Sequence, residues 1–172
     1  MKIIWFLALL TLVLTVALVI AGQAGLLAGK APAKLGVVDG RLKPPSSNPN
    51  SVSSQASLYP DHPQKAYATI EPFAFKGDGE TAIQQLAQVL TTWERTVIVT
   101  QNADFLYAQC TTALLKFTDD VVFWLDKSNK VIQVRSASRL GQKDLGVNRA
   151  RVEAIRAAFA EVNSKTPDLL QK

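Results

Sequence analysis

The sequence is poor in the residues on which metal sites and many hydrolases depend. It contains one cysteine, Cys110, and one histidine, His62. A single cysteine excludes an intramolecular disulfide, and no spacing typical of metal ligands is present. There is also no serine, histidine and acid set for acyl transfer, no P-loop and no dinucleotide-binding fingerprint. We therefore expect no metal, no cofactor and no catalytic residues, so that an enzymatic activity is open but unsupported.

Neither of these two single residues points to chemistry. Cys110 lies in an apolar run from Phe105 to Phe117, which favours a small buried thiol over a reactive or intermolecular one. His62 lies between Asp61 and Pro63 in a proline-rich stretch. We expect it to be a surface residue without a functional role, because no partner residues lie nearby in the sequence.

Acidic residues are absent from the first 29 positions, which hold a single lysine. The formal net charge of +5 therefore belongs mostly to the remainder of the chain. A mild basic excess fits an anionic membrane surface or a small anionic ligand, or simply a soluble surface. No run of lysine or arginine is present, so we expect no nucleic-acid partner.

The N-terminal segment is predicted to cross a membrane. From Ile3 to Ile20 the chain carries no charge. A helix over this run rises about 27 Å, close to the roughly 30 Å of a bilayer core. The run is longer than the apolar part of most secretory signals, so we interpret residues 1–29 as an uncleaved signal-anchor whose partner is the membrane. The alternative is cleavage at Gly22-Gln23-Ala24 and secretion.

The charges that flank this segment give conflicting signals about its orientation. Lys2 and the α-amino group precede it, whereas Asp39 and four basic residues follow it. These four are Lys30, Lys34, Arg41 and Lys43. Counting positive charges would place the domain in the cytoplasm. The short N-terminal flank and the signal-like design favour export instead.

Residues 30–64 are predicted to form a tether, and the folded domain follows it at residues 65–165. The tether holds most of the chain's eight prolines and a serine- and asparagine-rich stretch, a composition that predicts no packed element. The domain ends at Thr166-Pro167, after which residues 166–172 are a tail.

The domain shows the patterns of two helices and several strands. One amphipathic helix begins after Asp78, and a second runs from Val147 to Val162. Their apolar stripes are Ile83, Leu86, Ala87, Leu90 and Trp93, and Val152, Ile155, Phe159 and Val162. Strands are predicted at 66–75, 96–100, 105–117, 121–125 and 130–136, the last two joined as a hairpin.

Short connections between these strands predict an α+β fold, an antiparallel sheet with both helices packed on one face. Several strands are apolar on both faces, for instance from Val121 to Trp124. We expect the second face either to fill a core or to meet the membrane, a partner or a second copy of the chain.

Asp119 and Asp120 are adjacent carboxylates at the start of a predicted strand. Adjacent strand residues point to opposite faces, so the two cannot form a general acid–base pair with each other. We expect structural ion pairs with arginines.

The connection from Arg135 to Glu153, here called the junction, concentrates groups that bind anions. Arginine offers a planar fork suited to carboxylate or phosphate, and a helix capped by Asn148 would present backbone N–H groups beside it. The candidate ligand-binding residues are Arg135, Ser136, Ser138, Arg139, Asn148 and Arg149. The competing interpretation is structural, with the arginines paired to Asp119, Asp120, Asp144 and Glu153 so that they fix the helix to the sheet.

The same residues carry a resemblance to a known family. The phrases Phe117-Thr118-Asp119-Asp120-Val121, Arg135-Ser136-Ala137-Ser138-Arg139 and Asp144-Leu145-Gly146-Val147-Asn148-Arg149 follow one another in this order. They resemble the domain-of-unknown-function family 1499, and residues 47–54 are similar to its proline/serine/asparagine motif. The resemblance covers about residues 42–159. It implies a protein of the bacterial envelope or of plastids, which favours export, and it implies no catalytic residue.

The chain departs from the family pattern at one place. The family commonly has two cysteines that bracket the proline/asparagine motif, where this chain has Pro45 and Ser51. Any disulfide, redox or metal role of that pair is therefore lost here.

These observations together predict a single-pass bacterial membrane protein with its domain in the periplasm or outside the cell. We expect a binding or scaffolding role, with a small anionic ligand at the junction. The alternative is a hydrolase or transferase acting on an anionic envelope metabolite, with Asp119 or Asp120 as the base and the arginines as clamps.

Overall fold

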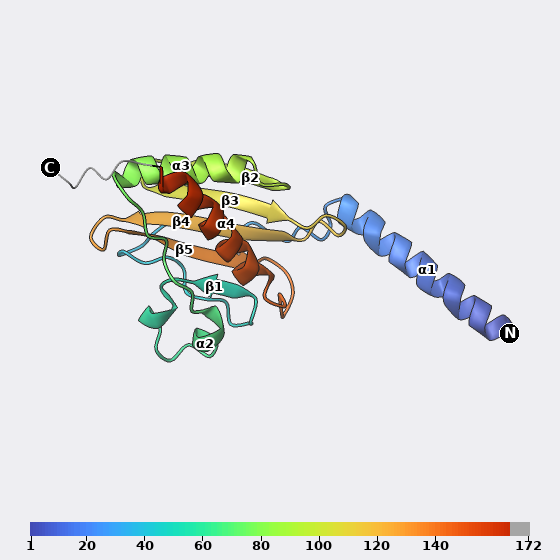
Figure 1. Ribbon diagram of the computed structural model, residues 1–172. Coiled ribbons are helices and arrows are strands. Elements are labelled where there is room, and N and C mark those ends of the chain that lie inside the picture. The colour runs from blue at the N-terminus through green and yellow to red at the C-terminus, as the bar shows by residue number, and fades with distance from the viewer. Residues whose placement is uncertain (166–172) are drawn as a thin grey trace.

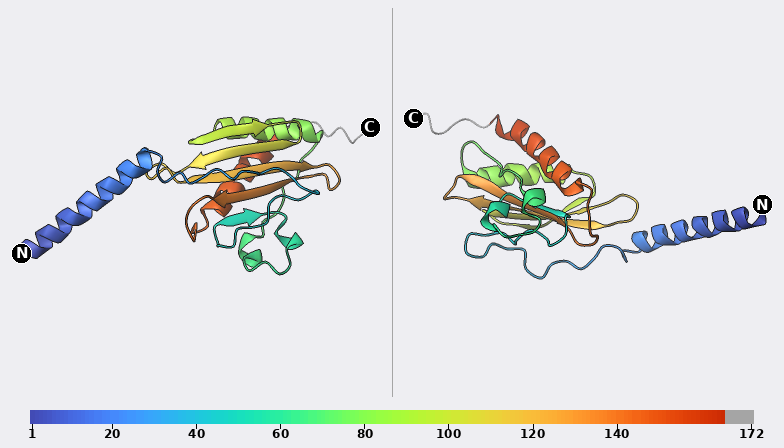
Figure 2. Two further views of the ribbon diagram at one scale, coloured as in Figure 1. Left: turned by 180° about the vertical axis from the view of Figure 1, so that it is seen from behind. Right: turned by 90° about the horizontal axis from the view of Figure 1, so that it is seen from below.

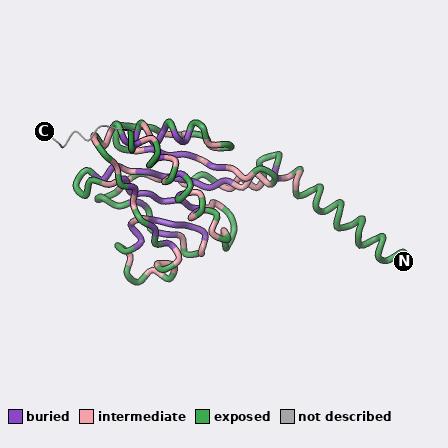
Figure 3. The backbone as a smooth tube through the Cα atoms, in the orientation of Figure 1, coloured by how far each residue is buried: buried purple, intermediate pink, exposed green. Residues whose placement is uncertain are grey.

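The structure, a computed structural model, describes residues 1–165 and has the α+β architecture that the sequence predicts (Figure 1). The predicted tail, residues 166–172, lies outside the described residues. Helix α1, Lys2–Gln23, projects away from the domain and is exposed along most of its length (Figure 3). It is long and apolar enough to cross a membrane, with a mean hydropathy of 2.9.

Five antiparallel strands form one sheet in the order β1-β5-β4-β3-β2. The strands are β1 (Ser51–Ser53), β2 (Thr96–Gln101), β3 (Phe105–Thr111), β4 (Thr118–Asp126) and β5 (Val131–Ser138). The predicted strands at 96–100, 121–125 and 130–136 are thereby confirmed. The hairpin between β4 and β5 is confirmed as well, and it brings Asp119 opposite Ser138 and Val122 opposite Arg135.

Two helices cover one face of the sheet, as predicted (Figure 2). α3, Gly79–Thr91, begins after Asp78, whose side chain accepts a hydrogen bond from the backbone N–H of Thr81 at 2.8 Å. α4 spans Val147–Asn163. Both helices turn their predicted stripes into the core, although Trp93 and Val162 at the stripe ends are only partly buried.

The second face of the sheet is covered by the chain itself. After α1, the tether runs along the sheet, turns back between Val38 and Arg41, and continues to β1 (Figure 2, left). Leu42 is only 2% exposed and packs in one cluster with Tyr107 of β3. The prediction that residues 30–64 form no packed element is therefore wrong. Proline removes a backbone donor, but it leaves neighbouring side chains free to be buried.

Two predicted strands differ from the structure. Over residues 66–75 the chain instead forms a short helix, α2 (Lys65–Ala68), and then an extended stretch that touches the sheet at isolated bridges. There Phe73 exchanges two backbone hydrogen bonds with Ile132, and its ring packs against Phe123 with centroids 5.4 Å apart. Isolated bridges and side-chain burial therefore fix this segment in place of a continuous strand. A short 3-10 helix, η1 (Ala56–Leu58), precedes it.

The strand predicted at 105–117 also ends early. β3 stops at Thr111, and residues 112–117 reverse the chain so that β4 can pair with β3. Lys116 in this turn has a positive φ of 54°, and the backbone N–H of Thr112 donates to the carbonyl of Phe117. The apolar run from Phe105 to Phe117 thus contains a hairpin turn that its apolar composition does not indicate.

Candidate functional site

The sheet separates the junction residues into two groups. Arg135 and Arg139 lie on the face covered by the tether, with Asp120. Ser136, Ser138 and Asn148 lie on the face covered by α4, with Asp119. The alternation predicted for Asp119 and Asp120 is confirmed, because each carboxylate meets a different arginine on a different face. The candidate ligand-binding residues therefore do not form one site.

On the tether face, Asp120 is the centre of a buried network. Arg139 donates to both of its oxygens, from Nε at 2.9 Å and from Nη2 at 2.7 Å. The Tyr107 hydroxyl donates to the same carboxylate at 2.6 Å, and Gln109 donates to that hydroxyl. Burial, with the hydrogen bond to Asp120, raises the pKa of Tyr107, and the bond to Asp120 raises the pKa of Arg139. This network holds its charges at fixed positions.

Arg135 lies beside this network but outside it. Its side chain is almost fully buried, and its Nε donates to the carbonyl of Pro44 in the tether at 3.2 Å. Among the described residues, no carboxylate forms an ion pair with it, since Asp120 is bound by Arg139. Burial lowers the pKa of Arg135 to about 10, against the opposing influence of Asp120. At neutral pH this arginine is therefore a buried cation.

On the helix face, Asn148 is a fully buried node of hydrogen bonds. Its Oδ1 accepts from Ser136 Oγ at 2.5 Å and from Arg151 Nη1 at 2.8 Å. Its Nδ2 donates to Ser138 Oγ at 2.9 Å and to the carbonyl of Asn50 at 3.1 Å. With both ends of its amide bonded inside the protein, Asn148 joins α4 to β5 and to the residue that precedes β1.

The start of α4 is capped by Asp144 and not by Asn148, which corrects the predicted N-cap. Asp144 accepts from the backbone N–H groups of Gly146 and Asn148, both at 3.1 Å, and from the Tyr67 hydroxyl. Burial alone would raise the pKa of Asp144, but the hydrogen bonds from Tyr67 and Asn148 outweigh it and lower the pKa. The helix N-terminus thus already holds a carboxylate of the protein's own, in the place where an external anion was expected.

Three further charged residues of the junction, Arg149, Arg151 and Glu153, also have internal partners. Arg151 donates to Asp119 at 2.5 Å. Arg149 donates to the backbone carbonyls of Tyr67 and Thr69. Glu153 pairs with Arg156 on the surface of α4 at 2.9 Å. Of the four acids expected in ion pairs, three have an arginine, and Asp144 has hydrogen bonds instead.

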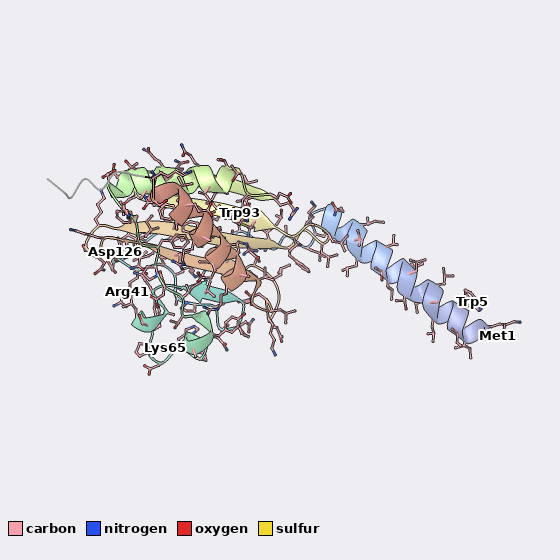
Figure 4. All side chains as sticks on the ribbon, in the orientation of Figure 1. Met1, Trp5, Arg41, Lys65, Trp93 and Asp126 are labelled. Carbon is pink, nitrogen blue, oxygen red and sulfur yellow. The ribbon has the colours of Figure 1, made fainter. Side chains whose placement is uncertain are left out.

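A groove of about 920 Å³ opens where the tether turns back on itself. Val37, Leu42 and Tyr59 contribute to its apolar wall, and the Tyr59 hydroxyl donates to the carbonyl of Leu42 at 3.0 Å. Its charged residues are Lys34, Asp39, Arg41 and Lys43. Arg41 lies on the side of the domain away from Met1 and Trp5 of α1 (Figure 4). Pro44 lines the groove and also accepts the hydrogen bond from Arg135, so the buried cation lies directly behind this part of the lining.

Sequence reasoning missed this groove because its residues lie in the segment interpreted as a tether. In the sequence, Lys34, Arg41 and Lys43 stand out only as basic residues that flank the apolar N-terminal segment. Their convergence depends on a contact between Pro44 and Arg135, which are 91 positions apart.

Neither Cys110 nor His62 takes part in the groove. Cys110 is buried in β3, and burial raises the pKa of its thiol, which makes the reactive thiolate scarce. The Nδ1 of His62 accepts a hydrogen bond from the backbone N–H of Gln64 at 3.1 Å. The structure thus uses His62 within a local turn.

Comparison with known proteins identifies one family. The family described as "Protein of unknown function (DUF1499)" matches residues 41–159. No curated protein and no solved structure matches the chain. The matched region begins at Arg41, so it contains the groove's Arg41, Lys43 and Tyr59 as well as the whole sheet.

Proposed function

The chain belongs to the DUF1499 family, and we propose that it is a membrane-anchored binding domain whose groove takes an anion with an apolar portion. One observation carries the proposal, namely that Arg135 is a buried cation without an ion-pair partner among the described residues, and that it lies behind the lining of a groove of about 920 Å³, bonded to the carbonyl of the lining residue Pro44. This volume lies in the range of ligand pockets, roughly 300–1,000 Å³.

The buried charge of Arg135 has an energetic consequence. Burial lowers the pKa of Arg135 to about 10, which means that it disfavours the charged form. The corresponding penalty is about 3 kcal/mol at neutral pH. An anion placed in the groove would offset part of this penalty, and the oppositely charged partner inside the protein is already bound to Arg139. A cation of this kind favours anions over neutral ligands.

The lining of the groove supports the same ligand class. Lys34, Arg41 and Lys43 outnumber Asp39, so the lining carries a net positive charge. Val37, Leu42 and Tyr59 offer an apolar wall beside these charges. Ligand pockets typically combine such a wall with a few fixed polar groups. An organic phosphate or carboxylate satisfies both parts, whereas an inorganic ion would leave the wall unused.

The other junction residues keep a supporting role in this proposal. Ser136, Ser138, Arg139, Asn148 and Arg149 have partners inside the protein, and they hold the strands and α4 on which Arg135 is placed. The alternative hydrolase or transferase would need a free carboxylate as its base. Asp119 and Asp120 are each held by an arginine, so no specific observation favours that alternative.

Phenyl phosphate is a suitable probe, because it joins an anion to an apolar ring and does not partition strongly into detergent. We expect isothermal calorimetry on the full chain in micelles to detect its binding, with weaker binding of inorganic phosphate and none of benzyltrimethylammonium. Arg135→Met and Lys43→Ala should each weaken phenyl phosphate roughly tenfold, the loss typical of a charge-assisted hydrogen bond.

Lys165→Ala is the matched control, since Lys165 is exposed beyond α4 on the other face of the domain. It should leave the affinity unchanged. Equal affinities for phenyl phosphate in the wild type, Arg135→Met and Lys165→Ala would refute the groove as the site.

We also propose that α1 anchors the protein with its domain in the periplasm or outside the cell. The support is an exposed apolar helix of 22 residues that is long enough to cross a membrane. Fusions of the C-terminus to alkaline phosphatase, which is active after export, and to green fluorescent protein, which needs the cytoplasm, should give activity only with the first. The mass of the membrane-extracted chain distinguishes an intact anchor from cleavage after Ala24.

A further inference from the structure

We propose that the loops next to α1 form a surface that lies on anionic lipid headgroups. This membrane-side surface consists of Leu114 and Lys116 in the β3–β4 turn and Leu140, Lys143 and Leu145 in the β5–α4 loop. The inference rests on the proposed anchoring by α1, and it adds a second contact between the domain and the bilayer.

The position of α1 determines how close these loops lie to the bilayer. A helix of 22 residues rises about 33 Å, which just spans a bilayer core. Its last residue, Gln23, donates through Nε2 to the carbonyl of Leu114 at 2.8 Å. Gly22 lies so close to the same turn that an added Cβ would be 2.6 Å from the Leu115 carbonyl oxygen. The β3–β4 turn therefore lies where the helix leaves the membrane.

The β5–α4 loop lies beside this turn. Thr112 and Phe117 of the turn line one hollow of about 320 Å³ together with Leu140 and Leu145 of the loop. Gly29, just after α1, packs so closely on Leu140 that an added Cβ would be 3.0 Å from its Cγ. In Figure 1 the turn and the loop are at the same end of the domain, the end from which α1 departs.

The side chains of both loops have the character of a membrane interface. Leu114 is 61% exposed, Leu140 43% and Leu145 91%. Lys143 is exposed and Lys116 half-exposed between them. The acid of the loop, Asp144, is turned inward to Tyr67 and Asn148. Apolar side chains beside lysines, without an outward acid, suit the boundary between acyl chains and anionic headgroups.

Leu145 is the most informative residue of this surface. It adopts a left-handed backbone with φ of 53°, which is unusual for a bulky side chain, and it packs on little of the domain. Glycine or asparagine would adopt this backbone conformation at a lower energetic cost, and an exposed leucine adds little to the core, so the stability of the fold does not require leucine here. A leucine at this place is explained by a contact outside the domain.

The test uses the full chain in vesicles of phosphatidylcholine with and without phosphatidylglycerol. A nitrobenzoxadiazole label is attached at Leu145→Cys, at Leu12→Cys inside α1, and at Ser128→Cys in the β4–β5 turn at the opposite end of the sheet. The native Cys110 is buried and should not react with the label. The wild type, treated with the label in the same way, measures any background labelling at Cys110. We expect doxyl-lipid quenching and a blue-shifted emission at positions 145 and 12, and neither at 128. Without phosphatidylglycerol the quenching at 145 should fall.

The outcomes separate the inference from the anchoring on which it rests. A quenched label at 12 with a water-exposed label at 145 would overturn the membrane-side surface and leave the anchor intact. A water-exposed label at 12 would overturn both. A label at 145 that is blue-shifted in vesicles but is not quenched by doxyl lipid would point to a protein partner or a second copy, and would also overturn it.

Two variants distinguish a loss of membrane contact from a loss of folding. Leu145→Asn should keep or raise the thermal stability of the domain, because asparagine tolerates a left-handed backbone, yet it should weaken vesicle contact as measured by quenching of a label at Leu140→Cys. Lys143→Glu should weaken the same contact only in vesicles that contain phosphatidylglycerol.

Discussion

Arg139 and Asp120 form a two-fold hydrogen-bonded pair in which Nε reaches Oδ2 at 2.9 Å and Nη2 reaches Oδ1 at 2.7 Å. Both side chains are almost fully buried, at 7% and 2% exposure. The pair lies under the start of the tether, since Gly29 packs against the Cβ of Arg139. It is therefore a contact on which both the sheet and the covering segment depend.

Removing either partner of this pair should have unequal effects. Asp120→Asn leaves Arg139 and Arg135 as two buried cations, and we expect it to lower the free energy of unfolding by about 3–5 kcal/mol. Arg139→Met should cost less, because Asp120 still interacts with Arg135. Urea unfolding of the full chain in micelles, followed by tryptophan fluorescence, measures both. An equal loss, or a larger loss for Arg139→Met, would mean that Arg135 does not compensate.

Arg135→Met should stabilise the protein in the absence of ligand by roughly 1 kcal/mol, because it removes a buried charge and keeps a similar volume. The sign follows from the pKa, since a base whose pKa is lowered on folding destabilises the fold while it is protonated, up to about pH 10. The measurement is the urea midpoint at neutral pH. A variant that is less stable than wild type would show that the charge, and not only the alkyl stem, supports the fold.

The cap at the start of α4 should make the stability depend on acid pH. The pKa of Asp144 is lowered on folding, so its contribution is full above the ordinary aspartate value of about 3.9 and is lost as the pH falls through the lowered value. Asp144→Asn should cost about 1 kcal/mol at neutral pH, and this difference from wild type should shrink on acidification. Asp61→Asn, at an exposed aspartate, is the control, and we expect its stability at neutral pH to match that of the wild type.

Asn148→Ala should be among the most damaging substitutions on the helix face. It removes the buried hydrogen bonds that Ser136, Arg151 and the carbonyl of Asn50 make to this side chain. We expect a loss of about 3 kcal/mol, measured by thermal unfolding. Asn163→Ala offers a comparison at the other end of α4, where Asn163 bonds Lys76 and Gln85. If Asn148→Ala lowers the stability no more than a substitution at an exposed surface residue does, the hydrogen bonds of Asn148 do not hold α4 to the sheet.

Gly22→Val should separate α1 from the β3–β4 turn, because a side chain there collides with the backbone of Leu115. Electron-spin distance measurements between labels at Leu18→Cys and Ser128→Cys should give a broader distribution in this variant. Gly36→Val is the matched control, since no heavy atom lies within 4 Å of its added Cβ. Identical distributions in all three proteins would show that the contact does not fix the helix.

The sequence predicts those parts of the fold that depend on local periodicity. The stripe from Ile83 to Leu90 and the alternation at Asp119 and Asp120 are local patterns, and the structure has both. The capping of α4 is less accessible, because Asp144 and Asn148 are both good capping residues and only the loop geometry, with Leu145 and Gly146 in left-handed backbone, selects Asp144.

The groove could not be predicted from local patterns. Nothing within the proline-rich segment indicates that Leu42 is buried against Tyr107 or that Pro44 accepts a bond from Arg135. The same limit applies to the junction, where the proximity of six polar residues in the sequence suggests one site. Strand alternation divides them between two faces, and whether each face is covered depends on distant parts of the chain.

The strand β1 has a consequence for the order in which the chain folds. It is an edge strand whose ladder partner is β5, and Pro44 before it contacts Arg135, which is synthesised 91 residues later. Closing so long a loop becomes favourable only once the partner strand is in place. The segment that emerges first from the ribosome after α1 must therefore wait for β5. The groove is assembled late, and a chain that ends before β5 retains its apolar helix while lacking the strand against which the segment that lines the groove is held.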